Sequence, residues 1–123
     1  MFCLAGDGGW GYSMADVETA ARRKLPLIAV ILNNSSLGWI KHSAQNRYPD
    51  GIVSEDFIKV SYADAAKALG AQTRAVADYG DFEAALKTAI ADTARRPWVI
   101  EATTCDIETP VQPSRVAKPI GGY

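Results

Sequence analysis

The chain has 123 residues, of which 48% are hydrophobic and 22% are charged. This length and composition predict one soluble domain with its own hydrophobic core and exclude an intrinsically disordered chain. Thirteen lysines and arginines nearly balance fourteen aspartates and glutamates, so the sequence has no basic field of the kind that binding to nucleic acid or to an anionic membrane requires.

The first residues, MFCLAGDGG, contain neither a basic flank nor an apolar stretch long enough for a signal peptide or a membrane span. The only cysteines are Cys3 and Cys105, which we interpret as buried or incidental thiols. No disulfide framework is expected, and a cytoplasmic location is predicted. The chain starts directly in an apolar segment, which indicates a fragment of a longer protein.

The first predicted strand covers residues 2–5 and is followed by the glycine-dense segment GDGGWG, which is typical of a tight turn. A helix is expected after this turn. Ser13 and Asp16 have the spacing of a capping box, and apolar residues then recur on one helical face up to Lys24. Pro26 is expected to end this helix.

The second predicted strand is the continuous apolar run LIAVIL at residues 27–32, which is typical of a central parallel strand covered on both faces. It ends at Asn33 and Asn34. A short helix is predicted from Leu37 to about His42. The polar, proline-bearing stretch HSAQNRYPDGIVSED has no hydrophobic period and predicts a loop.

The second half of the chain begins with another predicted helix. Residues 57–69 show helical spacings and end before Gly70, a residue type that often caps a helix C-terminus. A weak strand is predicted at residues 72–76. The apolar residues of segment 82–90 give the clearest amphipathic helix of the chain, with Asp81 as its expected N-cap.

The last predicted strand spans residues 98–103. The proline-bearing residues 106–123 predict an extended tail that follows a single domain at residues 1–105. Short apolar strands that alternate with helices are the pattern of βαβ units. The sequence therefore predicts an α/β fold, specifically a three-layer domain with a mainly parallel sheet.

Two polar segments stand at the carboxyl ends of the first two predicted strands, GDGG at residues 6–9 and NN at residues 33–34. In open α/β sheets, ligands bind at this edge. A helix N-terminus beside Asp7 allows backbone N–H groups to face a phosphate while the carboxylate faces its metal. Mg²⁺ is commonly bound by one or two protein oxygens together with phosphates and water. The side-chain oxygens of Asp7 and Asn34 suit that role.

The same two segments resemble a known family signature. GDG, separated from NN by residues 9–32, resembles the thiamine-diphosphate signature GDG…NN of pyruvate decarboxylases, acetolactate synthases and their relatives. The resemblance implies thiamine diphosphate and Mg²⁺ as cofactors, with the Asp7 carboxylate, the Asn34 amide and the Ser36 backbone carbonyl as metal ligands. It implies that the cofactor-binding residues are Gly6, Asp7, Gly8, Gly9, Asn34, Ser36, Leu37 and Gly38.

The resemblance extends along the chain. Residues 16–41, 55–71 and 97–104 are similar to segments of acetolactate-synthase-like enzymes. They fall in the C-terminal part of the family's diphosphate-binding domain, so the resemblance implies a domain that is truncated at its N-terminus. The parent enzyme would act on a 2-oxo acid by decarboxylation or acyl transfer.

The family's activating glutamate lies in a separate pyrimidine-binding domain, and no residue of this chain corresponds to it. The resemblance therefore implies no catalytic residue here. It implies a partner, namely a pyrimidine-binding domain or subunit on another chain or in a missing segment, together with homo-oligomerisation. We expect the chain to anchor the cofactor and to be inactive alone.

Two other functions are compatible with the sequence. Gly6-x-Gly8-x-x-Gly11 also fits the dinucleotide-binding fingerprint of Rossmann-type domains. That fingerprint expects an acidic residue near the end of the second strand, where this chain has Asn33 and Asn34. The chain can also be interpreted as a non-catalytic remnant or an oligomerising module with no cofactor turnover.

Overall fold

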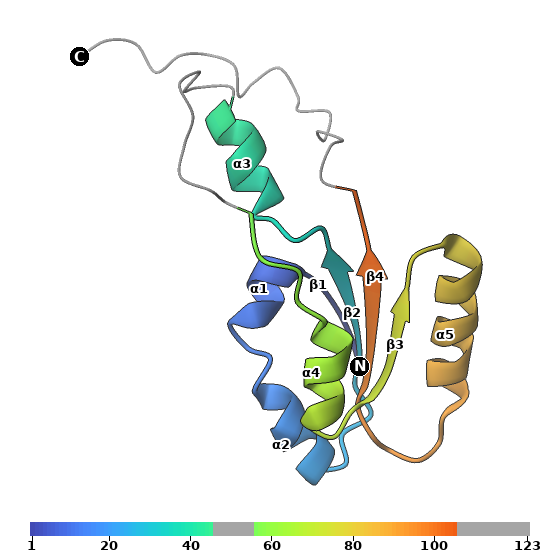
Figure 1. Cartoon of the computed structure of the whole chain (residues 1–123). Coiled ribbons are helices and arrows are strands. Elements are labelled where there is room, and N and C mark those ends of the chain that lie inside the picture. The colour runs from blue at the N-terminus through green and yellow to red at the C-terminus, as the bar shows by residue number, and fades with distance from the viewer. Residues whose placement is uncertain (46–55, 106–123) are drawn as a thin grey trace.

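The computed structural model describes residues 1–45 and 56–105, and its centre is a four-stranded sheet (Figure 1). The strands are β1 (Phe2–Gly6), β2 (Ile28–Asn33), β3 (Gln72–Val76) and β4 (Trp98–Thr103). All neighbouring strands run parallel, in the order β1-β2-β4-β3. The predicted parallel sheet is confirmed, and β3 and β4 span the residues expected from the sequence.

Within the described residues, five helices connect the strands: α1 (Asp7–Gly11), α2 (Asp16–Arg22), α3 (Gly38–Gln45), α4 (Tyr62–Ala68) and α5 (Tyr79–Ala91). Helices α1, α2 and α4 cover one face of the sheet, and α5 covers the other (Figure 1). Helix α3 extends beyond the carboxyl ends of the strands. This arrangement is the three-layer α/β fold that the sequence predicts.

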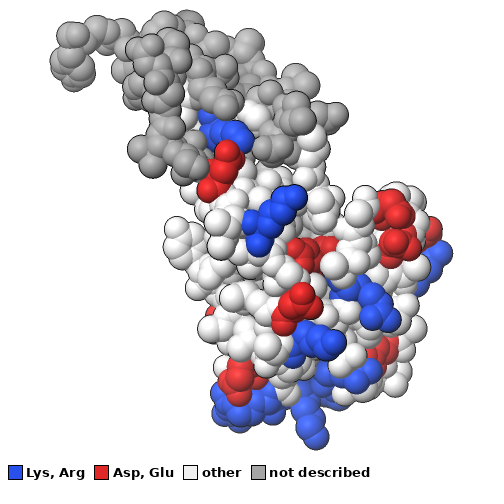
Figure 2. Space-filling view, viewed as in Figure 1, with Lys and Arg blue, Asp and Glu red and all other residues white. Residues whose placement is uncertain are grey.

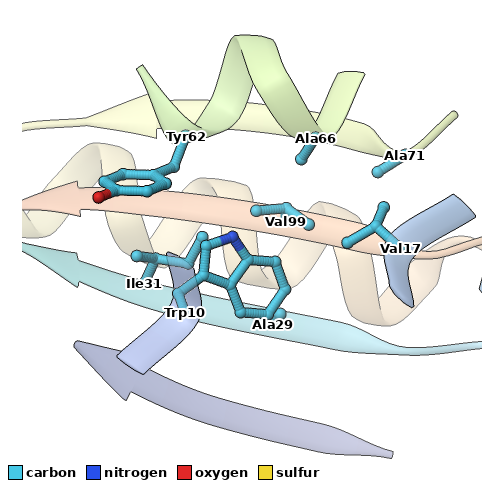
Figure 3. Packing of buried hydrophobic residues seen from close by; sticks show 8 residues of the cluster. All are labelled: Trp10, Val17, Ala29, Ile31, Tyr62, Ala66, Ala71 and Val99. Carbon is cyan, nitrogen blue, oxygen red and sulfur yellow. The ribbon is translucent and has the colours of Figure 1, made fainter. Parts of the chain in front are cut away.

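Two hydrophobic cores lie on opposite faces of the sheet, because successive residues of a strand point to opposite sides. The first core joins the sheet to α1, α2 and α4 (Figure 3) and contains Trp10, Val17, Ala29, Ile31, Tyr62, Ala66, Ala71 and Val99. The second core joins the sheet to α5 and contains Val30, Val76, Ala85, Ala89, Trp98 and Ile100. Full burial of a side chain such as Ile31 contributes on the order of 1.5–3 kcal/mol.

One part of the sheet is bare. Helix α5 packs on β3 and β4, and none of the helices in the described ranges covers β1 on the same face of the sheet. Phe2 and Leu4 lie on this face, in register with Ile28 and Val30 of β2. They are 65% and 70% exposed, so the edge strand β1 presents an apolar surface.

The start of the chain corrects two predictions. The segment GDGGWG does not form the predicted turn, because α1 begins at Asp7 directly after β1 and the turn lies at residues 12–15. Ser13 and Asp16 do not form the predicted capping box. Helix α2 begins at Asp16 with Ala15 as its N-cap and without a side-chain cap. The hydrogen bond between Ser13 and Asp16 joins their backbones, with the Ser13 carbonyl accepting from the Asp16 N–H.

Helix α4 is shorter than the predicted helix over residues 57–69. The Phe57 N–H donates to the carbonyl of Ser35 at 2.7 Å, which ties this part of the chain to the segment after β2. Ser61 then caps α4 by accepting a hydrogen bond from the Asp64 N–H. Gly70 has a φ of +97°, a conformation that favours glycine, so its predicted role at the C-terminus of this helix is confirmed.

The predicted N-cap of α5 is also wrong by three positions. Asp78, not Asp81, precedes the helix in an extended conformation. Its carboxylate accepts a hydrogen bond from the Asp81 N–H at 2.9 Å. Both aspartates have the residue type that N-caps favour, and the path of the chain decides between them.

Residues 46–55 of the predicted loop and the predicted tail at residues 106–123 lie outside the described residues. In the two described ranges, no helix combines the length and the apolar character that crossing a membrane requires. Acidic and basic side chains are interspersed on the face shown in Figure 2, with basic side chains gathered at the end of the sheet opposite α3.

Candidate functional site

The structure brings the two predicted polar segments together at the carboxyl edge of the sheet. Gly6, the last residue of β1, is in register with Leu32 of β2. Asp7 follows β1 as the first residue of α1, and Asn34 follows β2 in the segment that leads to α3. The edge predicted from the sequence is therefore the edge at which these side chains meet.

Asp7 and Asn34 both face the backbone of Ser36. Asp7 is 2% exposed, and its two carboxylate oxygens accept hydrogen bonds from the Gly8 N–H at 2.9 Å and the Ser36 N–H at 3.3 Å. The Asn34 side-chain oxygen accepts from the same Ser36 N–H at 3.2 Å. Side-chain oxygens of two residues that follow neighbouring strands thus lie within hydrogen-bonding distance of the same Ser36 N–H group.

Two glycines allow this close approach. A Cβ atom at Gly8 would lie 2.6 Å from a methyl carbon of Leu37, and one at Gly38 would lie 2.9 Å from the side-chain nitrogen of Asn34. Glycine at position 8 lets Leu37 pack closely on α1, and glycine at position 38 leaves room for the side chain of Asn34. A Cβ at Gly9 would meet no heavy atom within 4 Å, so the protein itself leaves space open beside the motif.

The ligand chemistry of this cluster suits one class of metal. Among the described residues, no group of three or more His, Cys, Asp or Glu side chains could hold a metal ion. Asp7 is the carboxylate of the site, and the other nearby oxygens belong to an amide and to the backbone. Mg²⁺ accepts such a set, because phosphates and water complete its octahedral shell.

Behind this site lies one residue that the sequence analysis did not identify, Glu101, which holds the side chain of Asn33. Glu101 of β4 is buried, and its carboxyl oxygens accept hydrogen bonds from the Asn33 side-chain amide at 2.6 Å and the Ala63 N–H at 2.7 Å. The Asn33 side-chain oxygen accepts from the Ser35 N–H at 2.9 Å. A glutamate inside the apolar strand segment WVIEAT is the feature of the sequence that could have indicated this.

Tyr62 lies close to both acidic residues of the site region. It is 8% exposed and belongs to the first core (Figure 3). Burial raises the pKa of the Tyr62 phenol, and the charges of Asp7 and Glu101 raise this pKa further. Both effects favour the neutral form of the phenol beside these two carboxyl groups.

A second contact holds the segment after β2. Ser36 forms an isolated antiparallel bridge with Asp56. The Lys41 ammonium group lies 2.7 Å from the Asp56 carboxylate, and this hydrogen bond lowers the pKa of Asp56. The start of α3 and the segment before α4 are thereby joined beside the candidate site.

Of the two interpretations of the cysteines, buried or incidental, burial is wrong, because Cys3 and Cys105 are both exposed. The structure does not support the alternative of a dinucleotide-binding Rossmann-type domain. Its three glycines lie at the start and end of α1, but β2 ends in Asn33, whose side chain is held by Glu101. An acidic residue that could bind a ribose is not at that strand end.

A parallel sheet with helices on both faces and polar side chains at its carboxyl edge is the architecture of a cofactor-binding α/β domain. Residues 1–102 match the model of the family described as "Thiamine pyrophosphate enzyme, C-terminal TPP binding domain". The chain belongs to this family, and the resemblance found in the sequence is confirmed. The family description names thiamine pyrophosphate, that is thiamine diphosphate, as the ligand.

Individual relatives agree with this assignment. The chain is 36% identical over 104 residues to sulfoacetaldehyde acetyltransferase of Alcaligenes xylosoxydans xylosoxydans, an alignment that covers 85% of this chain and 16% of that protein. It is 37% identical over 73 residues to 2-hydroxyacyl-CoA lyase 2 of Bos taurus, covering 58% of this chain and 11% of that protein.

A solved structure shares the fold. The thiamine diphosphate-dependent 4-hydroxybenzoylformate decarboxylase of Rhodococcus jostii RHA1 superposes with a TM-score of 0.78 at 29% sequence identity. The match covers 85% of this chain and 19% of that chain. The chain thus spans less than a fifth of the length of each of these three proteins.

Proposed function

We propose that this chain binds the diphosphate of thiamine diphosphate through Mg²⁺, with the Asp7 carboxylate, the Asn34 side-chain oxygen and the Ser36 backbone carbonyl as protein ligands. The observation that carries this proposal is the convergence of Asp7 and Asn34 on the Ser36 backbone amide. Membership of a TPP-binding family supports the choice of cofactor. The small set of oxygen ligands supports the choice of Mg²⁺.

Residues next to the proposed metal ligands would contact the diphosphate of the cofactor. Backbone N–H groups at the start of α1 and α3 would face the diphosphate, and the positive ends of helix dipoles favour such anions. The remaining contacts would come from Gly6, Gly8, Gly9, Leu37 and Gly38. The open space at Gly9 supports a close approach of the diphosphate to the backbone there.

The chemistry of the proposed complete enzyme would come from the bound thiazolium ring, which acts as an electron sink. We propose that this chain supplies no catalytic side chain and that its residues bind and orient the cofactor. A pyrimidine-binding domain or subunit would supply the activating glutamate, in a homo-oligomeric assembly. Relatives named as a decarboxylase and an acetyltransferase support decarboxylation or acyl transfer on a 2-oxo acid.

Calorimetric titration of the 123-residue chain with thiamine diphosphate and Mg²⁺ tests the proposal. We expect binding heat with the wild-type chain and none with Asp7→Ala, because the variant lacks the only carboxylate of the proposed ligand set. Asp16→Ala is the matched control, since Asp16 is an exposed acidic residue of α2 and its loss should leave binding unchanged. Equal heat with Asp7→Ala, or no heat with the wild type at millimolar cofactor, would contradict the proposal.

One observation favours a second candidate function, an oligomerising module without cofactor turnover. The exposed apolar side chains Phe2 and Leu4 on edge strand β1 form a surface that another polypeptide could cover. Sedimentation analysis of the wild type and of Leu4→Ser tests this function. The oligomerising function would be favoured over cofactor binding if the wild type forms an oligomer that dissociates in Leu4→Ser and if the wild type binds no cofactor.

A further inference from the structure

Glu101 is buried, and its hydrogen-bond partners in the described part of the chain are uncharged. It is 6% exposed, and no lysine or arginine of the described residues forms an ion pair with it. Burial of a carboxyl group is costly unless hydrogen bonds replace its water. Its two oxygens accept one bond each, from the Asn33 side-chain amide and from the Ala63 N–H at the start of α4.

This pair of bonds determines which way the Asn33 amide faces. A carboxylate can only accept hydrogen bonds, so the Asn33 nitrogen must face Glu101, where it lies 2.6 Å from Oε1. The same nitrogen donates to the carbonyl of Val60 at 3.2 Å. The Asn33 oxygen is then left to accept from the Ser35 N–H.

The bond to Ser35 matters because the chain turns sharply there. Ser35 has a φ of +55°, in the left-handed region that residues other than glycine rarely adopt. The next N–H along the chain belongs to Ser36 and is the one shared by Asp7 and Asn34. A continuous series of hydrogen bonds therefore runs from Glu101 through Asn33 to the backbone beside the proposed metal ligands.

We propose that Glu101 is a positioning residue for the metal-binding segment: it orients the Asn33 amide, which holds residues 34–36 in the turn that brings Asn34 and Ser36 to Asp7. This inference rests on the function proposed above for Asp7, Asn34 and Ser36. Partners behind metal ligands typically change metal affinity by roughly 10- to 100-fold when they are removed. Loss of the Glu101 carboxylate should therefore weaken Mg²⁺ binding without removing any ligand.

A double-mutant cycle with Glu101→Gln and Asn33→Asp tests the orientation directly. In Asn33→Asp two acceptors face each other, and in Glu101→Gln the new amide nitrogen faces a donor, either the Asn33 amide or the Ala63 N–H. The double variant restores a complementary pair in the reversed sense, because the new amide nitrogen at position 101 can donate to the new carboxylate at position 33. The other oxygens can still accept from the Ala63 and Ser35 N–H groups. The bond from position 33 to the Val60 carbonyl is lost both in Asn33→Asp and in the double variant. We expect Mg²⁺ affinity, measured with saturating thiamine diphosphate, to fall roughly 10- to 100-fold in each single variant and to be clearly higher in the double variant than in Asn33→Asp.

Ile100→Val controls for a merely structural effect. Ile100 is the neighbour of Glu101 in β4, but it faces the second core. This control should lower the melting temperature and leave the Mg²⁺ affinity of the folded chain unchanged. Single variants that behave like this control, with lower melting temperature and wild-type affinity, would overturn the positioning role. So would a double variant that remains as weak as Asn33→Asp.

A readout without cofactor separates this inference from the proposed function. Amide hydrogen exchange at Ser35 and Ser36, followed by NMR, should accelerate in each single variant and slow again in the double variant. If the wild type binds no Mg²⁺ or thiamine diphosphate, the proposed function fails, and the exchange data alone decide whether Glu101 sets the turn. Unchanged exchange at both amides in the single variants would refute that role.

Discussion

Asp7 and Asn34 direct side-chain oxygens at one donor, the backbone N–H of Ser36, at 3.3 and 3.2 Å. The two residues come from the ends of neighbouring parallel strands, and the packing of the sheet brings them together. An oxygen-rich cluster is thus assembled by the protein alone. The two proposed side-chain ligands are therefore already close to each other without a bound cation.

Binding of thiamine diphosphate should depend on Mg²⁺. Without the metal, the diphosphate and the Asp7 carboxylate would repel each other as like charges. We expect EDTA to abolish the binding heat of the wild-type chain. In Asp7→Asn the repulsion is gone, so metal-free binding should be no weaker than in the wild type, while Mg²⁺ should strengthen it much less. Wild-type binding that is equally tight in EDTA would contradict a metal-mediated contact.

Gly38→Ala should weaken cofactor binding without unfolding the chain. The new Cβ would lie 2.9 Å from the Asn34 side-chain nitrogen and would push that amide away from Ser36. Alanine also favours a helix over glycine by up to about 1 kcal/mol, so helix α3 should not lose stability.

Gly11→Ala is the matched control for this substitution, since a Cβ at Gly11 meets nothing within 4 Å. Titration calorimetry and thermal unfolding of both variants check the prediction. Equal cofactor affinity in Gly38→Ala and Gly11→Ala would show that the position of the Asn34 amide does not matter.

Asp92 should stabilise the fold in a pH-dependent way. Hydrogen bonds from the Ala94 N–H, the Arg96 guanidinium and the Trp98 indole lower the pKa of Asp92 from 3.8 to about 2. Because the pKa is lower in the folded chain, this stabilisation is fully present above about pH 4 and is lost as the pH falls towards 2.

Asp92→Asn should therefore be less stable than the wild type at neutral pH. We expect the difference between their melting temperatures to shrink as the pH is lowered from 4 towards 2. Thermal unfolding of both proteins at a series of pH values measures this difference. A difference that stays constant over this range would show that the Asp92 carboxylate is not responsible.

The two cores should contribute independently to stability. Val17→Ala removes buried methyl groups from the first core and should cost about 1–3 kcal/mol, and Ile100→Val in the second core should cost about 0.5–1.5 kcal/mol. Since the sheet separates the two sites, the costs should add within about 0.5 kcal/mol in the double variant. Urea unfolding measures all three. A larger departure from additivity would indicate that the two cores are coupled.

The strands could be predicted because their information is local. The apolar run before Asn33 and the segment WVIEAT mark two buried strands through residue type alone. The caps could not be predicted in this way. Asp78 and Asp81 are equally suitable residue types, and the choice depends on the turn that follows β3.

Part of the candidate site could likewise be predicted from the sequence, and part of it could not. The positions of Asp7 and Asn34 follow from the rule that ligands bind at the carboxyl edge of parallel strands. The contact between Asn33 and Glu101 joins residues far apart in the sequence, and neither residue has a local pattern that pairs it with the other. Only the order of the strands, with β2 beside β4, brings them together.

The most direct test of the central claim replaces Mg²⁺ with paramagnetic Mn²⁺ in the presence of thiamine diphosphate and follows backbone amide signals by NMR. The proposed ligands predict that broadening is strongest at the Gly8 and Ser36 amides, which hydrogen-bond to Asp7, weakens with distance from them, and is lost in Asp7→Ala. Broadening centred elsewhere on the chain, or none at saturating Mn²⁺ and cofactor, would contradict the account.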